Sequence, residues 1–217
     1  MAKLFQGSVG KKISMSLTGL FLCLFLVVHL SGNLLLLKND GGVAFNQYSE
    51  FMSTNPLIRI SEIILAAAFL VHIITAILLS LQNQEARPDR YVLDRSYVHT
   101  SFASRTMIYT GSLVFIFLVI HLKTFFVPHR LFHSEQTMYQ TVKLAFENPF
   151  YTGFYVVAMV LLTLHLWHGF QSAFQSLGLR HRRYTPLIEK LGMGFSILIP
   201  LGFGLIPLYF FFRQFLK

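Results

Sequence analysis

The histidines are the residues of this chain whose type and spacing could do chemistry. Five of them lie within long apolar stretches: His29, His72, His121, His165 and His168. An imidazole placed in hydrocarbon loses its hydration, so it persists there only if a hydrogen bond or a metal ion replaces the lost water. Cys23 is the only cysteine, which excludes a disulfide framework, an iron–sulfur cluster and thioether-attached haem. Any cofactor must therefore be held non-covalently by other residues.

Two of these histidines belong to a pattern that occurs twice. Residues 15–30 read MSLTGLFLCLFLVVHL and residues 107–122 read MIYTGSLVFIFLVIHL, with Met, Thr, Gly and His at identical spacing. The histidine of each copy, His29 or His121, precedes the histidine of the following apolar stretch by 43 or 44 positions. The repeat predicts two equivalent helix pairs, each with one histidine on its outgoing helix and one on its returning helix.

The elements that position these histidines are predicted to be membrane-spanning helices. Only 12% of the residues are charged, 23 are phenylalanines and the mean hydropathy is +0.57, a composition that a soluble surface does not have. Since a span takes about 20 residues and lipid offers the backbone no hydrogen-bond partner, each long apolar stretch must be helical. Five stretches qualify: 13–37, 57–81, 107–127, 151–178 and 191–212. We therefore predict an all-α integral membrane bundle of five helices as a single domain over residues 1–217. Four of the helices, those that carry the histidines, are expected to enclose the cofactors that the histidines would bind.

The distribution of charge predicts the orientation and the partners of the bundle. Eleven Lys and Arg residues fall on the side of the N-terminus and seven on the other side, which favours an N-terminus inside. The first stretch has no signal-peptide cleavage site and is expected to be a retained span. The net charge of +9 is spread between apolar runs, so we expect membrane lipid and no nucleic acid as a partner.

Two details concern the connections and the last span. Residues 38–56 and 128–150 are too long for simple turns, and the aromatic residues of the first of these connections fall near helical spacing, which predicts a short interfacial helix. Pro200 and Pro207 are expected to bend the fifth span without ending it.

Depth along the helices groups four histidines into two levels. His29 and His121 lie roughly 23 Å from the inner ends of their helices, and His72 and His165 roughly 15–20 Å from the inner ends of theirs. Two facing imidazoles at one level are the arrangement for six-coordinate haem iron within a helical bundle. We therefore predict two haems b, with His29, His72, His121 and His165 as iron ligands.

Other roles for the histidines stay open. A zinc site would need ligands that converge on one point, usually with Cys or carboxylate among them, and a proton path would not need the twofold matching. Any single histidine could instead be a buried imidazole bonded to a neighbouring helix. His168 is deep enough to replace His165, but the spacing to the first half favours His165, which leaves His168 as a pocket or quinone-side residue.

Small residues accompany the predicted ligands. Gly19 and Gly111 each lie ten residues before a histidine, and Ala76 and Gly169 each lie four residues after one. We expect these matched pairs to leave room for a flat porphyrin. The alternative for each one is close packing of membrane helices, in which small residues are common.

A few charged residues could assist. Glu50 and Glu62 lie near the outer surface and could exchange a proton with a quinone, although Glu62 could equally form an ion pair with Arg59 at i and i−3. Arg105, beside Ser101 and Ser104, could bond haem propionates or serve only as a topology charge.

Three stretches resemble a known family, the membrane cytochrome b subunit of succinate dehydrogenase and fumarate reductase, in its single-chain, five-helix, di-haem form. They are HLSGN from His29, RTMIYTG from Arg105 with the following His121-Leu, and HLWHGFQSAFQSLG from His165. The resemblance covers nearly the whole chain and implies ligand pairs from spans one and three and from spans two and four.

The resemblance also implies partners, location and activity. A flavoprotein subunit with the succinate or fumarate site and an iron–sulfur subunit would dock on the inner face of a bacterial cytoplasmic membrane. Electrons would pass between the iron–sulfur subunit and a quinone, with menaquinone expected, and this chain would do no dicarboxylate chemistry itself. Some family members carry a proton-conducting glutamate two residues before the fourth-span ligand; Thr163 stands at that position here, so that role does not transfer.

Two further functions remain as alternatives. The first is a cytochrome b subunit of another respiratory dehydrogenase, which would share the haem logic. The second is a haem-free transporter or channel that uses histidines in its membrane region.

Overall fold

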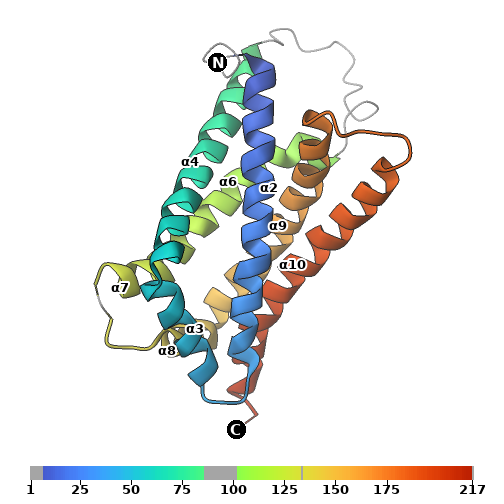
Figure 1. Cartoon of the computed structure of the whole chain (residues 1–217). Coiled ribbons are helices and arrows are strands. Elements are labelled where there is room, and N and C mark those ends of the chain that lie inside the picture. Colours follow the sequence, from blue (N-terminus) through green and yellow to red (C-terminus); the bar gives the residue numbers. More distant parts are fainter. Residues whose placement is uncertain (1–6, 86–101, 133, 217) are drawn as a thin grey trace.

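Long helices form most of the molecule. The computed structural model describes residues 7–85, 102–132 and 134–216, with side chains from residue 106 onward in the second range, and no strand occurs within them. The five long helices are α2 (Ser8–Asn33), α4 (Pro56–Glu85), α6 (Phe102–His121), α9 (Pro149–Ser176) and α10 (Thr185–Arg213) (Figure 1). Short elements join them: η1 (Leu34–Leu37), α3 (Val43–Thr54), the π-turn η2 (Leu122–Phe126), α7 (Val127–Arg130) and α8 (Met138–Glu147).

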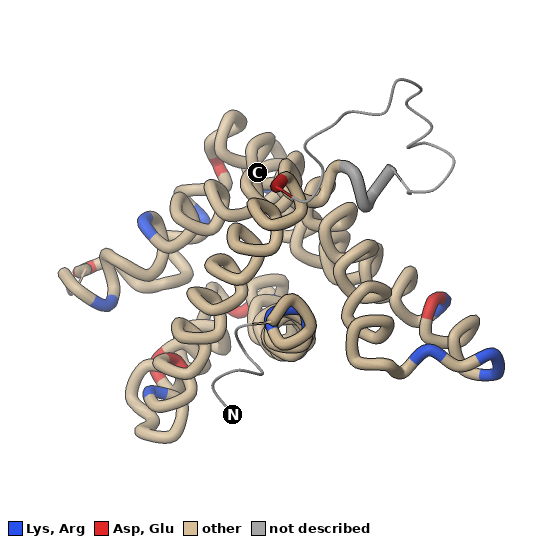
Figure 2. Tube along the Cα trace, turned by 90° about the horizontal axis from the view of Figure 1, so that it is seen from above, with Lys and Arg blue, Asp and Glu red and all other residues tan. Residues whose placement is uncertain are grey.

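Five segments are long and apolar enough to cross a membrane, which confirms that part of the prediction. They are Ser8–Leu37, Pro56–Glu85, Thr106–Arg130, Pro149–Ser176 and Thr185–Arg213. Two of these segments, Ser8–Leu37 and Thr185–Arg213, begin five and six residues before the predicted boundaries, because the helices continue into the flanking polar residues. Seen from above, long stretches of the trace carry no charged residue (Figure 2). The predicted single domain includes residues outside the described ranges and stays a prediction.

The five helices run alternately up and down, and α2 and α9 lie at the centre (Figure 1). Helix α2 packs against α4, α9 and α10, while α9 packs against α6 and α10. The two helix pairs predicted from the repeat, α2 with α4 and α6 with α9, are therefore neighbours in space. Helix α10 packs against α9 and, less extensively, against α2.

The end of the bundle where α2 finishes is closed by short helices. Helix α3 confirms a short helix in this connection, while its place at the membrane interface stays a prediction. Helix α8 begins with a capping box in which Thr137 and Gln140 satisfy each other's backbone amides. Gly42 precedes α3 with φ of +90°, and a side chain there would also clash with Tyr139. A buried cluster that includes Leu36, Phe45 and Phe146 joins η1, α3 and α8 to the long helices.

The third span changes its winding directly after His121. The helix widens into the π-turn η2 before Pro128 in the first turn of α7. A proline has no N–H to donate, and its ring clashes with the carbonyl four residues earlier, so a local change of pitch accommodates it. In α10, Pro200 and Pro207 are both fully buried and the helix continues through them, as predicted.

Candidate functional site

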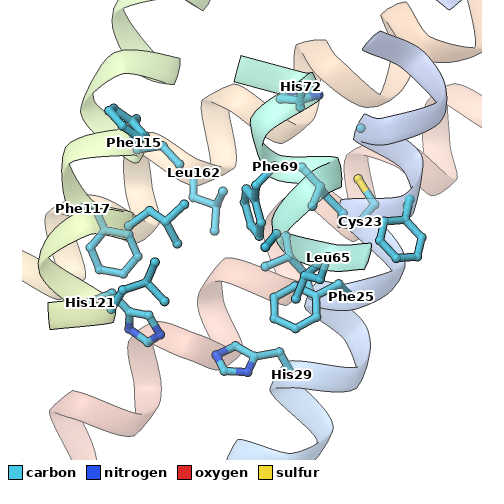
Figure 3. Close-up of a pocket in the computed structure, with 18 of the residues that line it drawn as sticks. Cys23, Phe25, His29, Leu65, Phe69, His72, Phe115, Phe117, His121 and Leu162 are labelled. Atoms are coloured by element: carbon cyan, nitrogen blue, oxygen red, sulfur yellow. The ribbon is translucent and has the colours of Figure 1, made fainter. Parts of the chain in front are cut away.

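His29 and His121 face each other between α2 and α6. Their ring centroids are 5.9 Å apart and the ring planes are inclined by 89°. Figure 3 shows the two rings pointing toward one another across a pocket. Each ring is backed by a phenylalanine four residues earlier on its own helix: Phe25 stacks on His29 at 5.2 Å, and Phe117 lies 5.8 Å from His121. The repeated sequence therefore reproduces the same local packing twice.

His72 and His165 form a second facing pair between α4 and α9. Their ring centroids are 6.5 Å apart, with an interplanar angle of 74°. Because Gly19 lies against His72 and ten residues before His29, the two pairs are separated by about 15 Å along α2. Figure 3 shows this separation, with His72 at the opposite end of the pocket from His29 and His121, and with Phe69 and Leu162 between them.

The separation of the rings in each pair fits two ligands of one metal ion. A metal–imidazole bond is about 2.0–2.1 Å long and each ring centre lies about 1.1 Å behind its nitrogen, so two imidazoles on opposite sides of a metal have centres roughly 6.3 Å apart. The observed values of 5.9 and 6.5 Å bracket that distance. In the described part of the chain no three or more His, Cys, Asp or Glu side chains gather where they could hold a metal. Each pair therefore offers a metal two imidazole ligands from the described residues.

The polar neighbours of the ring nitrogens differ among the four histidines. The Nδ1 atom of His121 lies 2.9 Å from the Tyr155 hydroxyl, and that of His72 lies 3.3 Å from the Thr18 hydroxyl. The Nδ1 atom of His29 is 3.5 Å from the Asn33 amide nitrogen, the limit for a hydrogen bond. In these three histidines a polar neighbour therefore lies beside the Nδ1 atom of the ring.

His165 is the exception. Its Nδ1 atom is buried and has no hydrogen-bond partner within the described residues. A buried polar atom without a partner is costly and commonly marks a functional group or a missing ligand.

The two matched glycines lie against the histidine of the neighbouring helix. A Cβ atom at Gly19 would stand 3.3 Å from His72 Cε1, and one at Gly111 would stand 3.2 Å from His165 Cε1. A side chain at either position would push the ring aside. The glycines thus make room for an imidazole of the second pair, a contact that the sequence did not predict. Clearance for a porphyrin stays a prediction.

A large cavity joins the two histidine pairs. Its volume is about 2870 Å³, well above the roughly 300–1,000 Å³ of ordinary ligand pockets. All four histidines line it, together with Gly19, Gly111, Ala76 and many aliphatic and aromatic side chains of α2, α4, α6 and α9. The cavity can accommodate ligands much larger than a metal ion.

His168 and Gly169 also line this cavity. The ring that faces His72 is that of His165, while its assignment as an iron ligand stays a prediction. A Cβ atom at Gly169 would contact only the methyl group of Met107, at 3.4 Å. Arg105 belongs to α6, but its side chain lies outside the described residues.

Glu62 takes part in the ion pair that was the alternative to a quinone role. Its carboxylate accepts hydrogen bonds from Arg59 at 2.6 Å and from Arg130 at 2.8 Å. Arg130 also donates to the Ser53 carbonyl at 3.0 Å, which ties α7 to α4 and to α3. Glu62 and Glu50 both line the cavity, so a role beside a quinone remains a prediction for both.

Two contacts of candidate site residues were not predicted from the sequence: that of Tyr155 with His121 and that of Arg130 with Glu62. A signal for Tyr155 exists in the repeat, because Tyr155 precedes His165 by ten positions as Glu62 precedes His72.

Comparisons of the chain with protein-family models, with curated proteins and with solved structures found no match.

Proposed function

We propose that this protein is a di-haem cytochrome b membrane anchor of a succinate:quinone oxidoreductase or fumarate reductase. The observation that carries the proposal is the presence of two facing histidine pairs on a duplicated helix pair, with ring centroids 5.9 and 6.5 Å apart. In this assignment His29 and His121 hold one haem, and His72 and His165 hold the other. The resemblance of the chain to that family supplies the physiological partners.

The residues at both levels suit haem b. Each pair supplies two neutral nitrogen ligands on opposite helices, and the macrocycle would supply the other four. His165, whose Nδ1 has no hydrogen-bond partner within the described residues, faces the ring of His72. The cavity around both rings is lined mainly by apolar side chains. When bound, haem supplies one-electron redox chemistry, which protein side chains lack.

The chain's own residues orient the ligands and exclude water. Phe25 and Phe117 pack on the rings of the first pair, while Gly19 and Gly111 give the rings of the second pair their space. The surrounding apolar shell lowers the local polarity, which together with ligand hydrogen bonding sets a haem potential. Arg105 is proposed to bond a propionate.

The remaining parts of the proposal concern the complex. The chain would pass electrons between an iron–sulfur subunit and menaquinone in a bacterial cytoplasmic membrane, with its N-terminus inside and a flavoprotein subunit bound to the iron–sulfur subunit. Glu50, Glu62 and His168, which line the cavity, are proposed to face the quinone.

The first experiment is a reduced-minus-oxidised spectrum with haem quantification on the purified full-length chain. We expect b-type bands and two haems per chain. A colourless protein after full reconstitution, or one that takes up a single haem, contradicts the proposal. Identification of the co-purifying subunits separates this function from that of a cytochrome b of another dehydrogenase, and a haem-free transporter would show no such bands.

Single substitutions test the assignment of the ligands. His29→Ala and His121→Ala should each remove the same haem and leave the other, because each level needs both of its imidazoles. His165→Ala should remove the second haem, whereas His168→Ala should leave both bound. Unaltered spectra in His29→Ala and His121→Ala would show that the first pairing is wrong.

A further inference from the structure

Tyr155 is a buried tyrosine on α9 whose hydroxyl contacts a predicted iron ligand. Its side chain is only 5% exposed, and its oxygen lies 2.9 Å from His121 Nδ1. The Tyr151 hydroxyl, one turn earlier, is 3.4 Å away from the Tyr155 hydroxyl. Aromatic rings surround it, with Phe117 at 4.8 Å and Phe146 at 4.9 Å between centroids. This enclosure holds the hydroxyl in one place.

The proposed ligation of iron by His121 would set the direction of this hydrogen bond. When the Nε2 side of an imidazole faces a metal, its Nδ1 carries the proton and must donate it. With iron on Nε2, as proposed, His121 would donate to Tyr155, and the proton of Tyr155 would be free to point toward Tyr151. Such an acceptor fixes the tautomer and the orientation of the ring.

Among the other predicted ligands only His72 has a hydroxyl beside its Nδ1, that of Thr18, and at 3.3 Å this contact is longer than the 2.9 Å between Tyr155 and His121. Glu62 occupies the position in α4 that corresponds to Tyr155 in α9, but its carboxylate is engaged by Arg59 and Arg130. His29 has only the distant Asn33 amide near its Nδ1, and the Nδ1 of His165 has no partner within the described residues. The two halves of the repeat thus differ at the ring nitrogens.

We propose that Tyr155 is a positioning residue for His121 and makes the reduction potential of the haem at the His29–His121 pair more negative. This inference rests on the proposed function. An acceptor on Nδ1–H makes the imidazole a stronger electron donor, and a stronger donor stabilises the oxidised metal over the reduced one. The haem proposed at the His72–His165 pair has ligands that do not contact Tyr155, and it serves as an internal reference.

The test is a potentiometric titration of the full-length protein with both haems bound, wild type against Tyr155→Phe. The haem lost in His29→Ala identifies the one under study. We expect its equilibrium constant for reduction to increase three- to tenfold, a positive shift of roughly 30–60 mV at 59 mV per tenfold change for one electron. The other haem should keep its potential. Tyr151→Phe, which removes a hydroxyl that does not touch His121, should change the first potential less.

Each result decides the inference. Two bound haems with unchanged potentials in Tyr155→Phe overturn the role of Tyr155 and leave the proposed function standing, as does an equal shift of both potentials. A wild-type chain without haem overturns the proposed function itself. If Tyr155→Phe loses the first haem alone, Phe146→Leu is the matched control, because it perturbs the same cluster without removing a hydroxyl. Retention of that haem in Phe146→Leu supports the role, and its loss there overturns it.

Discussion

Gly111 offers a sharp test of how the second histidine pair is built. The glycine lies on α6, whereas the ring that it contacts, His165, belongs to α9. Replacing Gly111 by leucine adds a side chain where the ring now lies. Gly153 on α9 is a matched control, because a Cβ atom there meets nothing within 4 Å.

The distances give the size of the effect. A Cβ atom at Gly111 would stand 3.2 Å from His165 Cε1 and 3.5 Å from Nδ1, whereas ordinary contacts begin near 3.4 Å. Alanine therefore requires a movement of about 0.2 Å, comparable to the tolerance of a metal–ligand distance. Leucine extends its branched carbons further toward the ring and must displace it by more than the roughly 0.5 Å that a binding constellation tolerates.

The assay is haem content per purified chain together with unfolding temperature. Gly111→Leu should bind about one haem, retained at the His29–His121 pair, because only the second pair is disturbed. Gly111→Ala should keep both with weaker binding of the second. Gly153→Ala should keep both and gain up to about 0.5–1 kcal/mol of helix stability, since alanine has the higher helix propensity.

One result would refute this reasoning. If Gly111→Leu bound two haems as tightly as the wild type, His165 could not occupy the place described here while ligating iron. Gly153→Leu is the control for the size of the new side chain. If both Gly111→Leu and Gly153→Leu lost both haems and unfolded at a much lower temperature, the bundle would tolerate leucine at neither position. Gly111→Ala would then be the deciding variant.

Two further predictions concern the end of the bundle near α3 and α7. The Arg130–Glu62 bond joins half-buried partners with exposed side-chain fractions of 21% and 27%, so a double-mutant cycle with Arg130→Ala and Glu62→Gln should give a coupling free energy of about 0.5–1.5 kcal/mol; a value of zero would show that the bond contributes nothing. Hydrogen bonds from the Ala44 and Gly42 amides hold the pKa of Asp40 below its usual value. These two bonds at the start of α3 are therefore complete above the ordinary aspartate pKa of about 3.9 and are lost as the pH falls through the lower, folded value. Hydrogen exchange at the start of α3 should accelerate over that acidic range in the wild type, and an identical pH profile in Asp40→Ala would contradict this.

The amino-acid sequence by itself was sufficient to predict the five spans and which histidines share a level, although the levels lie further apart than predicted. Length and the lack of charge define a membrane helix, because lipid excludes charged groups and unpaired backbone. Since a helix rises by a constant amount per residue, the repeat also predicted that His29 shares a level with His121 and His72 with His165. The facing pairs confirm those levels, while iron binding stays a prediction.

Tertiary structure decided which side chains meet at each level. In a soluble helix a polar face marks the outside, but in a membrane helix the lipid and the interior are both apolar, so the sequence pattern does not reveal the rotation of the helix about its axis. Gly19 against His72, Tyr155 against His121 and Arg130 against Glu62 all depend on that rotation and on how neighbouring helices pack. These contacts join residues 34 to 68 positions apart, and only the packed bundle brings them together.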